Sequence, residues 1–341
     1  MIIALSIVTV ILIFSIATMA LRLQVVEGGL VNFGIAANFG VGAYAYSLAT
    51  LKADHQPGAV SVGLGLSPFW GIILTIVVGL LVALVTGWMS VHLQPVYFAL
   101  VTFCYLVLMN LLLVGAQSFA DGSQGLSGVN PPLPSSLVTS NTGYTVGLLV
   151  LVCAITIGIG LVLRRLAKAP SSALLRLTRD DRLASSALGI HGWRIQLATF
   201  VLGAVVATIG GMLYAWYTGG AAPGNFTVSV TFTIFIAMIV GGRGSYLGSV
   251  VGCAILFGLD QGLDIIALPQ SIASRIAYIE SVPIGVVLLL IIRFWPEGIV
   301  PSRRFVYSAH DGIGSDAIAE EDRPFLSGDS ERPAGSGGRI L

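Results

Sequence analysis

The chain has 341 residues, of which 55% are hydrophobic and only 10% are Asp, Glu, Lys or Arg. Soluble domains carry about 25% charged residues, so this composition excludes a soluble globular protein and indicates one that lies in a membrane. The formal net charge of +1 gives no reason to expect nucleic acid as a partner, because neither sign of charge dominates.

Nine apolar runs are long enough to cross about 30 Å of hydrocarbon at about 1.5 Å per residue. They lie at residues 2–21, 28–51, 68–91, 95–116, 143–163, 195–217, 226–241, 244–268 and 276–295. The runs at 28–51 and 244–268 are rich in glycine, so each is a candidate for a broken or re-entrant helix. The expected fold is an all-α polytopic membrane protein with a bundle of about 8–10 transmembrane helices.

Basic residues gather in the segment 164–194, between the fifth and sixth runs. Seven of the 17 lysines and arginines lie there: Arg164, Arg165, Lys168, Arg176, Arg179, Arg182 and Arg194. The positive-inside rule assigns this loop to the cytoplasm. Threading the runs outward from it places the N-terminus outside and the C-terminus in the cytoplasm. The segment 117–142, rich in turn-forming residues, then becomes an external loop.

The basic loop also carries the signals of a short helix over residues 179–188. Thr178 is the predicted N-cap, with Asp181 at the third helical position of a capping box. Gly189 suits the left-handed residue that follows a helix, and Ile190 can fold back onto the preceding turn. A helix of about ten residues is only about 15 Å long, so it cannot be a span.

Two interpretations of this short helix compete: binding to the lipid surface, or insertion into a groove of a partner protein. Its apolar stripe consists of Leu183, Ala184, Ala187 and Leu188. The stripe is narrow and lacks Trp and Phe, which favours a protein cleft over lipid. We therefore interpret the loop as a docking element.

Few polar side chains lie within the apolar runs: Asn32, Asn38, Asn110, Asp260, Gln261 and Asp264. Asp260 and Asp264 are one helical turn apart, and ionisable groups at membrane depth are functional candidates by default. Because the pair lies toward the end of its run, an interfacial or pore-mouth position is favoured over direct contact with an ion or substrate.

Catalytic and nucleotide-binding motifs are missing from the sequence. A Walker A loop needs a lysine between glycine and Ser or Thr, and the two lysines, Lys52 and Lys168, lack that context. The three cysteines, Cys104, Cys153 and Cys253, stand singly in apolar runs, without disulfide or metal-ligand spacing. We expect no enzyme activity, no cofactor and no metal, and we expect any ATP hydrolysis to take place on a separate chain.

Six segments in chain order resemble the permease subunits of branched-chain amino acid ABC importers. They are Asn-Phe-Gly-Val-Gly-Ala-Tyr at 38–44, Val-Tyr-Phe-Ala-Leu-Val-Thr at 96–102, Gly-Ser-Gln-Gly-Leu at 122–126, the loop at 179–190, Val-Gly-Gly-Arg-Gly-Ser-Tyr-Leu-Gly at 240–248, and Phe-Trp-Pro-Glu-Gly-Ile at 294–299. The resemblance implies a permease domain at 1–301. The remaining residues, 302–341, are rich in Gly, Ser, Pro and acids, and this composition predicts a disordered cytoplasmic tail.

This resemblance further implies a bacterial inner-membrane protein with three kinds of protein partner: ABC ATPase subunits, a second permease subunit and an extracytoplasmic binding protein that delivers the substrate. The ATPase-coupling residues would be Arg179, Asp180, Asp181, Ala184, Leu188, Gly189 and Ile190. The translocation path is predicted beside Asn32, Gly34, Asn38, Gly40, Gly42, Asn110, Gly248 and Gly252. Small residues at helix interfaces usually serve packing, so the glycines are expected to pack, to line the path, or both.

Other functions stay open at this point. Urea, amide and sugar permeases share parts of the pattern, and amino-acid or amide substrates rank above sugars because the segment at 31–34 lacks the acidic, serine-rich character of the sugar branch. A channel or secondary transporter for a small neutral solute would need no ATPase. A membrane-embedded enzyme ranks last, because no catalytic constellation can be assembled.

Overall fold

The computed structural model describes residues 2–52, 63–129, 131–132, 141–180, 185, 189, 192–242, 244–265, 293 and 298–300. All of these residues belong to one compact unit, Met1–Ser302. The predicted tail at 302–341 and nearly all of the predicted ninth span at 276–295 lie outside the described residues, so both stay predictions.

Helices form in eight of the nine predicted apolar runs. They are α1 (Ile2–Arg22), α2 (Ile35–Thr50), α3 (Pro68–Ser90), α4 (Pro95–Gly115), α7 (Asn141–Lys168), α10 (Gly192–Thr218), α11 (Val228–Gly241) and α12 (Tyr246–Ile265). Within the described ranges, six helical segments are both long and apolar enough to cross a membrane: α1 with its continuation to Glu27, α3, α4, α7, α10, and α11 with the short turn before it. The predicted all-α polytopic membrane fold is confirmed.

The second apolar run is interrupted, as its glycines suggest. After α1 the chain makes one π-helical turn, η1 (Leu23–Glu27), and α2 begins only at Ile35. Gly29 in the intervening segment has a φ of +66°, a conformation that strongly favours glycine. With 16 residues, α2 is about 24 Å long, which is shorter than the hydrocarbon thickness.

Helix α10 lies at the centre of this unit and α3, α4 and α7 lie at its periphery. In α10 61% of the most apolar stretch is buried, against 22% in each of α3, α4 and α7. Large apolar side chains of the peripheral helices, such as Val85, Leu112 and Val150, are more than half exposed. This distribution fits helices whose outer faces contact lipid, where apolar exposure carries no penalty.

Glycines bring α2 and α10 into backbone contact. A Cβ added at Gly42 would collide with the backbone of Thr208, and one added at Gly211 would collide with the backbone of Phe39. The same device joins α11 to α12, where Gly241 and Gly248 face each other's backbones. Small residues at such positions let membrane helices approach closely.

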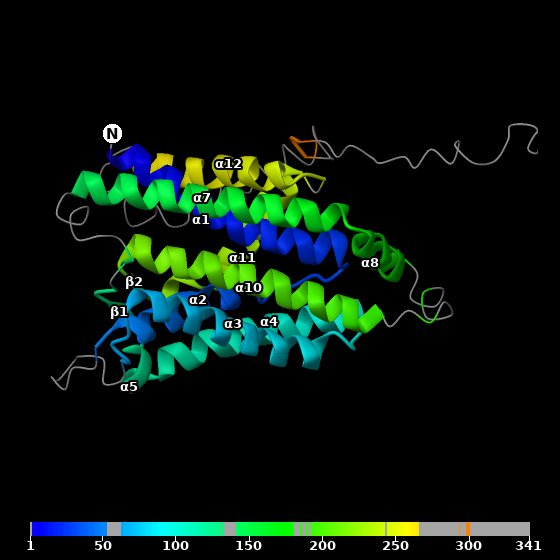
Figure 1. Cartoon of the computed structure of the whole chain (residues 1–341), viewed down its shortest axis with the longest axis horizontal. Coiled ribbons are helices and arrows are strands. Elements are labelled where there is room, and N and C mark those ends of the chain that lie inside the picture. Colours follow the sequence, from blue (N-terminus) through cyan, green and yellow to red (C-terminus); the bar gives the residue numbers. More distant parts are fainter. Residues whose placement is uncertain are drawn as a thin grey trace, which may run out of the picture. The chain divides into compact units, whose positions relative to one another are not determined.

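The predicted external loop at 117–142 contains some regular structure. It includes α5 (Gln117–Ala120) and the two-residue strand β1 (Leu126–Ser127). β1 pairs antiparallel with β2 (Gly220–Ala221), which follows α10, and η2 (Pro223–Asn225) leads from there into α11. In Figure 1, α5, β1 and β2 lie at one end of the helices and α8 (Pro170–Asp180) lies at the other.

Helix α8 corrects one sequence prediction. We predicted a helix that begins after an N-cap at Thr178, but Thr178 lies inside α8, where its hydroxyl donates to the carbonyl of Leu175 at 2.8 Å. Threonine satisfies its own hydroxyl in this way within helices, so a capping pattern alone did not identify a helix start. Gly189 has a φ of +74°, which confirms its predicted left-handed conformation.

Candidate functional site

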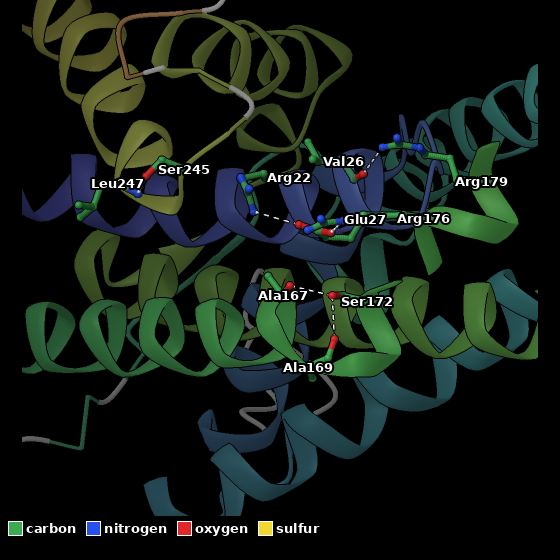
Figure 2. A network of polar contacts seen from close by, with 10 residues as sticks. All are labelled: Arg22, Val26, Glu27, Ala167, Ala169, Ser172, Arg176, Arg179, Ser245 and Leu247. Atoms are coloured by element: carbon green, nitrogen blue, oxygen red, sulfur yellow. Dashed lines mark hydrogen bonds and ion pairs between the residues drawn. The ribbon is translucent and has the colours of Figure 1, made fainter. Parts of the chain in front are cut away.

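A buried carboxylate joins α8 to the end of the first span (Figure 2). Glu27, the last residue of η1, accepts a hydrogen bond at 2.9 Å from Nε of Arg176 in the middle of α8. Its other oxygen lies 3.8 Å from Nη1 of Arg22, one turn back in α1. The Glu27 side chain is only 2% exposed, whereas that of Arg176 is 47% exposed. One partner is therefore buried and the other faces water.

The same network reaches a third helix through Arg22. The guanidinium carbon of Arg22 stands 4.0 Å above the ring centroid of Tyr246, the first residue of α12. Cation–π contacts of this kind are attractive and strengthen when the cation is shielded from water. Burying an unpaired carboxylate is costly, so Glu27 depends on these arginines. α1, α8 and α12 are thus tied to one another around a single carboxylate.

Arg179 makes the second contact between α8 and this segment. Its guanidinium donates to the backbone carbonyl of Val26. Its aliphatic stem lies against Gly29, where any added Cβ would collide with it. Gly29 therefore serves two purposes: it allows the left-handed turn and it leaves room for the arginine.

The corner between α7 and α8 is held by hydrogen bonds. Ser172 is buried, and its hydroxyl lies 2.7 Å from the carbonyl of Ala167 and 2.8 Å from that of Ala169. Pro170 at the start of α8 suits a first helical position because it needs no amide donor. α8 is therefore attached firmly to the end of the span before it.

On its inner side, the segment after α1 is fixed to α10 and to the start of α2. Nε2 of Gln24 donates to the carbonyl of Phe200 at 2.8 Å, and Oε1 of Gln24 accepts from Asn32 at 3.0 Å. Oδ1 of Asn32 in turn accepts from the amide of Gly34 at 2.8 Å. Gln24 fits against Gly203 of α10, where a Cβ would collide with its side chain.

Two further predicted path residues make hydrogen bonds between helices. Asn38 of α2 accepts a hydrogen bond at 3.3 Å from the hydroxyl of Tyr105 in α4. Asn110 of α4 donates at 2.8 Å to the carbonyl of Pro223, the first residue of η2. Together with the buried Asn32, the three predicted asparagines all have protein partners.

The predicted path glycines lie in close contact with neighbouring helices or side chains. A Cβ at Gly34 would meet Tyr105 at 2.8 Å, and one at Gly40 would meet the ring of Phe226 at 3.0 Å. Gly248 and Gly252 face the backbone of α11, and Gly42 faces that of α10. These contacts fit the packing role expected of the five glycines, and their role beside a translocation path stays a prediction.

The described residues cover only part of the predicted coupling set. Arg179 and Gly189 are described, and Asp180 is the last residue of α8. Asp181, Ala184, Leu188 and Ile190 lie outside the described residues. Asp260 and Asp264 both lie in α12, as predicted, but the structure describes only their backbone.

Sequence reasoning missed the ion pairs and the role of Gln24. Glu27, Arg22 and Arg176 were each visible as charges near the end of a span or in the loop, but nothing in their spacing indicates mutual contact. A usable signal was the pair Gln24 and Glu27, polar residues three apart at the end of an otherwise apolar run. Within the ranges that the structure describes, His, Cys, Asp and Glu form no group that could hold a metal ion.

Comparison with known proteins gives consistent matches. Residues 3–292 match the family described as branched-chain amino acid transport system / permease component. Among relatives, the high-affinity branched-chain amino acid transport system permease protein LivM of Escherichia coli K12 is 23% identical over 327 residues, covering 88% of this chain and 70% of the relative.

A probable branched-chain amino acid transport permease protein LivM of Methanocaldococcus jannaschii is 25% identical over 280 residues, covering 80% of this chain and 79% of the relative. No solved structure shows a significant match. The helical membrane fold and the match over most of its length show that the chain belongs to the branched-chain amino acid permease family and is a transport component, not an enzyme.

Proposed function

We propose that this chain is a membrane subunit of an ATP-driven importer and that its substrates are branched-chain amino acids. The family match and the names of its relatives support the substrate class. The observation that carries the mechanism is α8. This helix outside the spans is joined to the end of the first span by the Arg176–Glu27 ion pair, and through Arg22 to Tyr246 of α12. It precedes the basic loop. Such a helix can pass movement from a bound partner to the bundle.

The expected partners follow from the missing ATP-binding motif and from the predicted docking loop. Because the sequence has no Walker A lysine, separate ATPase subunits would hydrolyse ATP and bind the loop at 179–190. A second permease subunit would complete the membrane core, and an extracytoplasmic binding protein would deliver the amino acid. ATP-driven closure of the ATPases would move α8 and the attached spans by rigid-body alternating access.

Orientation in the membrane follows from charge and aromatic residues at one end of the unit. Arg176, Arg179 and Arg194 lie there, and the guanidinium of Arg194 stands 5.3 Å from the ring centroid of Trp193, itself in edge contact with Trp88. Tryptophans mark membrane interfaces and basic loops mark the cytoplasm. This end would be cytoplasmic in a bacterial inner membrane, with the N-terminus external.

Reconstitution tests the proposal. Proteoliposomes that contain this chain with its ATPases, second permease and binding protein should take up labelled leucine only with internal ATP. An excess of unlabelled urea or ribose should not reduce the uptake of labelled leucine. Leucine entry without ATP, from this chain alone, would support the channel alternative and contradict the importer.

A further inference from the structure

The segment between α1 and α2 has contacts on two sides. Toward α8, Glu27 binds Arg176, while Val26 and Gly29 contact Arg179. Toward the interior, Gln24 binds Phe200 of α10 and Asn32, which holds the amide of Gly34 just before α2. Any displacement of this segment by α8 would therefore be felt at the start of α2.

The residue that contacts α8 and the residue that contacts α10 lie in one helical turn. Gln24 and Glu27 lie in the same π-helical turn, Leu23–Glu27, and the amide of Leu30 donates to the carbonyl of Gln24 at 2.8 Å. Single π-helical turns inside helices occur frequently at functional sites. A turn of five residues has no room for a flexible joint between Gln24 and Glu27, so both must move together.

The two ion pairs of Glu27 differ in length and in the exposure of the arginine. Arg176 binds it at 2.9 Å and is 47% exposed, so water can solvate that guanidinium when α8 withdraws. Glu27 itself is 2% exposed and needs a remaining partner. Arg22, now 3.8 Å from Glu27 and 5% exposed, lies in position to become that partner. A shift of Arg22 would also change its contact with the ring of Tyr246.

We propose that Glu27 is a positioning residue that links the docking loop to transport, exchanging Arg176 for Arg22 as α8 moves and thereby shifting the segment that begins α2. Because this role presupposes an ATPase that moves the loop, it rests on the proposed function. The role differs from docking itself: losing Glu27 should leave the ATPases bound and active but disconnect their cycle from the bundle.

The experiment measures leucine uptake and ATP hydrolysis together in the fully reconstituted transporter. Glu27→Gln and Arg176→Ala should each lower the leucine transported per ATP by about fivefold or more, the scale of a typical coupling energy, while ATPase subunits still co-purify. Arg176→Lys should retain most of the ratio because it keeps a cation. Lys168→Ala, which removes a charge from the same loop outside the Glu27 ion pairs, serves as the matched control.

Glu27→Gln leaves the buried Arg22 without its carboxylate, so misfolding can also lower its uptake. A second variant separates misfolding from a loss of coupling. Arg176→Cys, in a background with Cys104→Ser and Cys153→Ser, can be modified after assembly because position 176 is exposed. A positively charged aminoethyl methanethiosulfonate reagent should raise the uptake per ATP again, and the negatively charged sulfonatoethyl analogue should not.

Three outcomes would overturn the role of Glu27. They are an unchanged ratio in both Glu27→Gln and Arg176→Ala, a parallel loss of ATPase binding and uptake in folded variants, or equal effects of the two reagents. A failure of the proposed function would look different, because the unmodified chain would then show no ATP-dependent uptake at all.

Discussion

The contact between α2 and α10 and the contact between α8 and the end of α1 hold the molecule together in opposite ways. The first is a backbone approach through Gly42 and Gly211, deep in the apolar unit. The second is a set of charged contacts around Glu27, one of whose partners is half exposed. Close packing tolerates almost no displacement, whereas the half-exposed Arg176 can move into water while Arg22 stays beside the buried Glu27.

This contrast assigns the two regions different duties. Helices α2 and α10 should move as one body, because separating them would open voids along a glycine-lined contact. α8 can shift relative to α1, because its arginines remain solvated when they leave. Substitutions in the first region should therefore reduce folded protein, and substitutions in the second should change function in a protein that is still folded.

The largest effect is expected at the backbone contact. Gly211→Ala adds a Cβ that meets the backbone of Phe39, so no side chain can move aside to make room. Forced separation of tightly packed helices costs about 1–3 kcal/mol or more, and the yield of monodisperse protein in detergent should fall sharply. Size-exclusion chromatography of a fluorescent fusion, with and without heating, measures this.

Gly158→Ala is the matched control, since it makes the same change in the interior of α7 where an added Cβ meets nothing within 4 Å. It should leave the yield unchanged or raise it slightly, as Ala favours helix over Gly by about 0.5–1 kcal/mol. Equal losses in the two variants would mean that the α2–α10 contact is not specially tight.

The next effect is expected in the loop, and it concerns binding. Gly189→Val places a β-branched residue at a φ of +74°, a conformation that costs about 1–2 kcal/mol for residues with a Cβ. The loop around Gly189, itself exposed, should rearrange and bind the ATPases less tightly, while the membrane unit stays monodisperse. Co-purification of the ATPases through a tag on this chain measures the effect, and undiminished co-purification would contradict the docking role.

These regions also differ in how far the sequence predicts them. Apolar runs were sufficient for the six spans found among the described residues, because a span depends on local composition. Glycine content was right about the interruption before Ile35 but not about 244–268, where α12 runs without a break from Tyr246 to Ile265. The N-cap at Thr178 was mispredicted because the pattern around it satisfies capping rules locally, whereas Thr178 lies inside α8, which is held by Ser172 and by the contact of Arg176 with Glu27. Contacts across 149 positions, as between Glu27 and Arg176, leave no trace in the spacing of a single sequence.

A smaller effect is expected where the two regions meet, at Gln24. Gln24→Met keeps the length of the side chain but leaves the carbonyl of Phe200 and the amide of Asn32 without this partner. A buried polar group that loses its partner costs about 1–3 kcal/mol, although hydrogen bonds in membrane proteins average only about 0.6 kcal/mol. We expect a lower thermal midpoint together with reduced leucine uptake, since Gln24 belongs to both regions.

Gln24→Glu keeps the acceptor for Asn32, but it replaces the donor to Phe200 by a buried negative charge facing that carbonyl, so it should be the more damaging of the two variants. If both variants transport normally at full stability, then the inner side of the segment contributes nothing to holding α2, and the link from α8 to α2 must run elsewhere.

The smallest effect is expected at Tyr105, where α4 meets α2. Tyr105→Phe removes only the 3.3 Å hydrogen bond to Asn38, a long bond, and keeps the ring that packs against Gly34. Asn38 retains its own hydrogen bond to the carbonyl of Gly34 at 3.3 Å, so the loss should stay below about 1 kcal/mol. Thermal unfolding should therefore barely change, and a change in uptake without one in stability would place Asn38 beside the moving substrate, which its packing alone does not require.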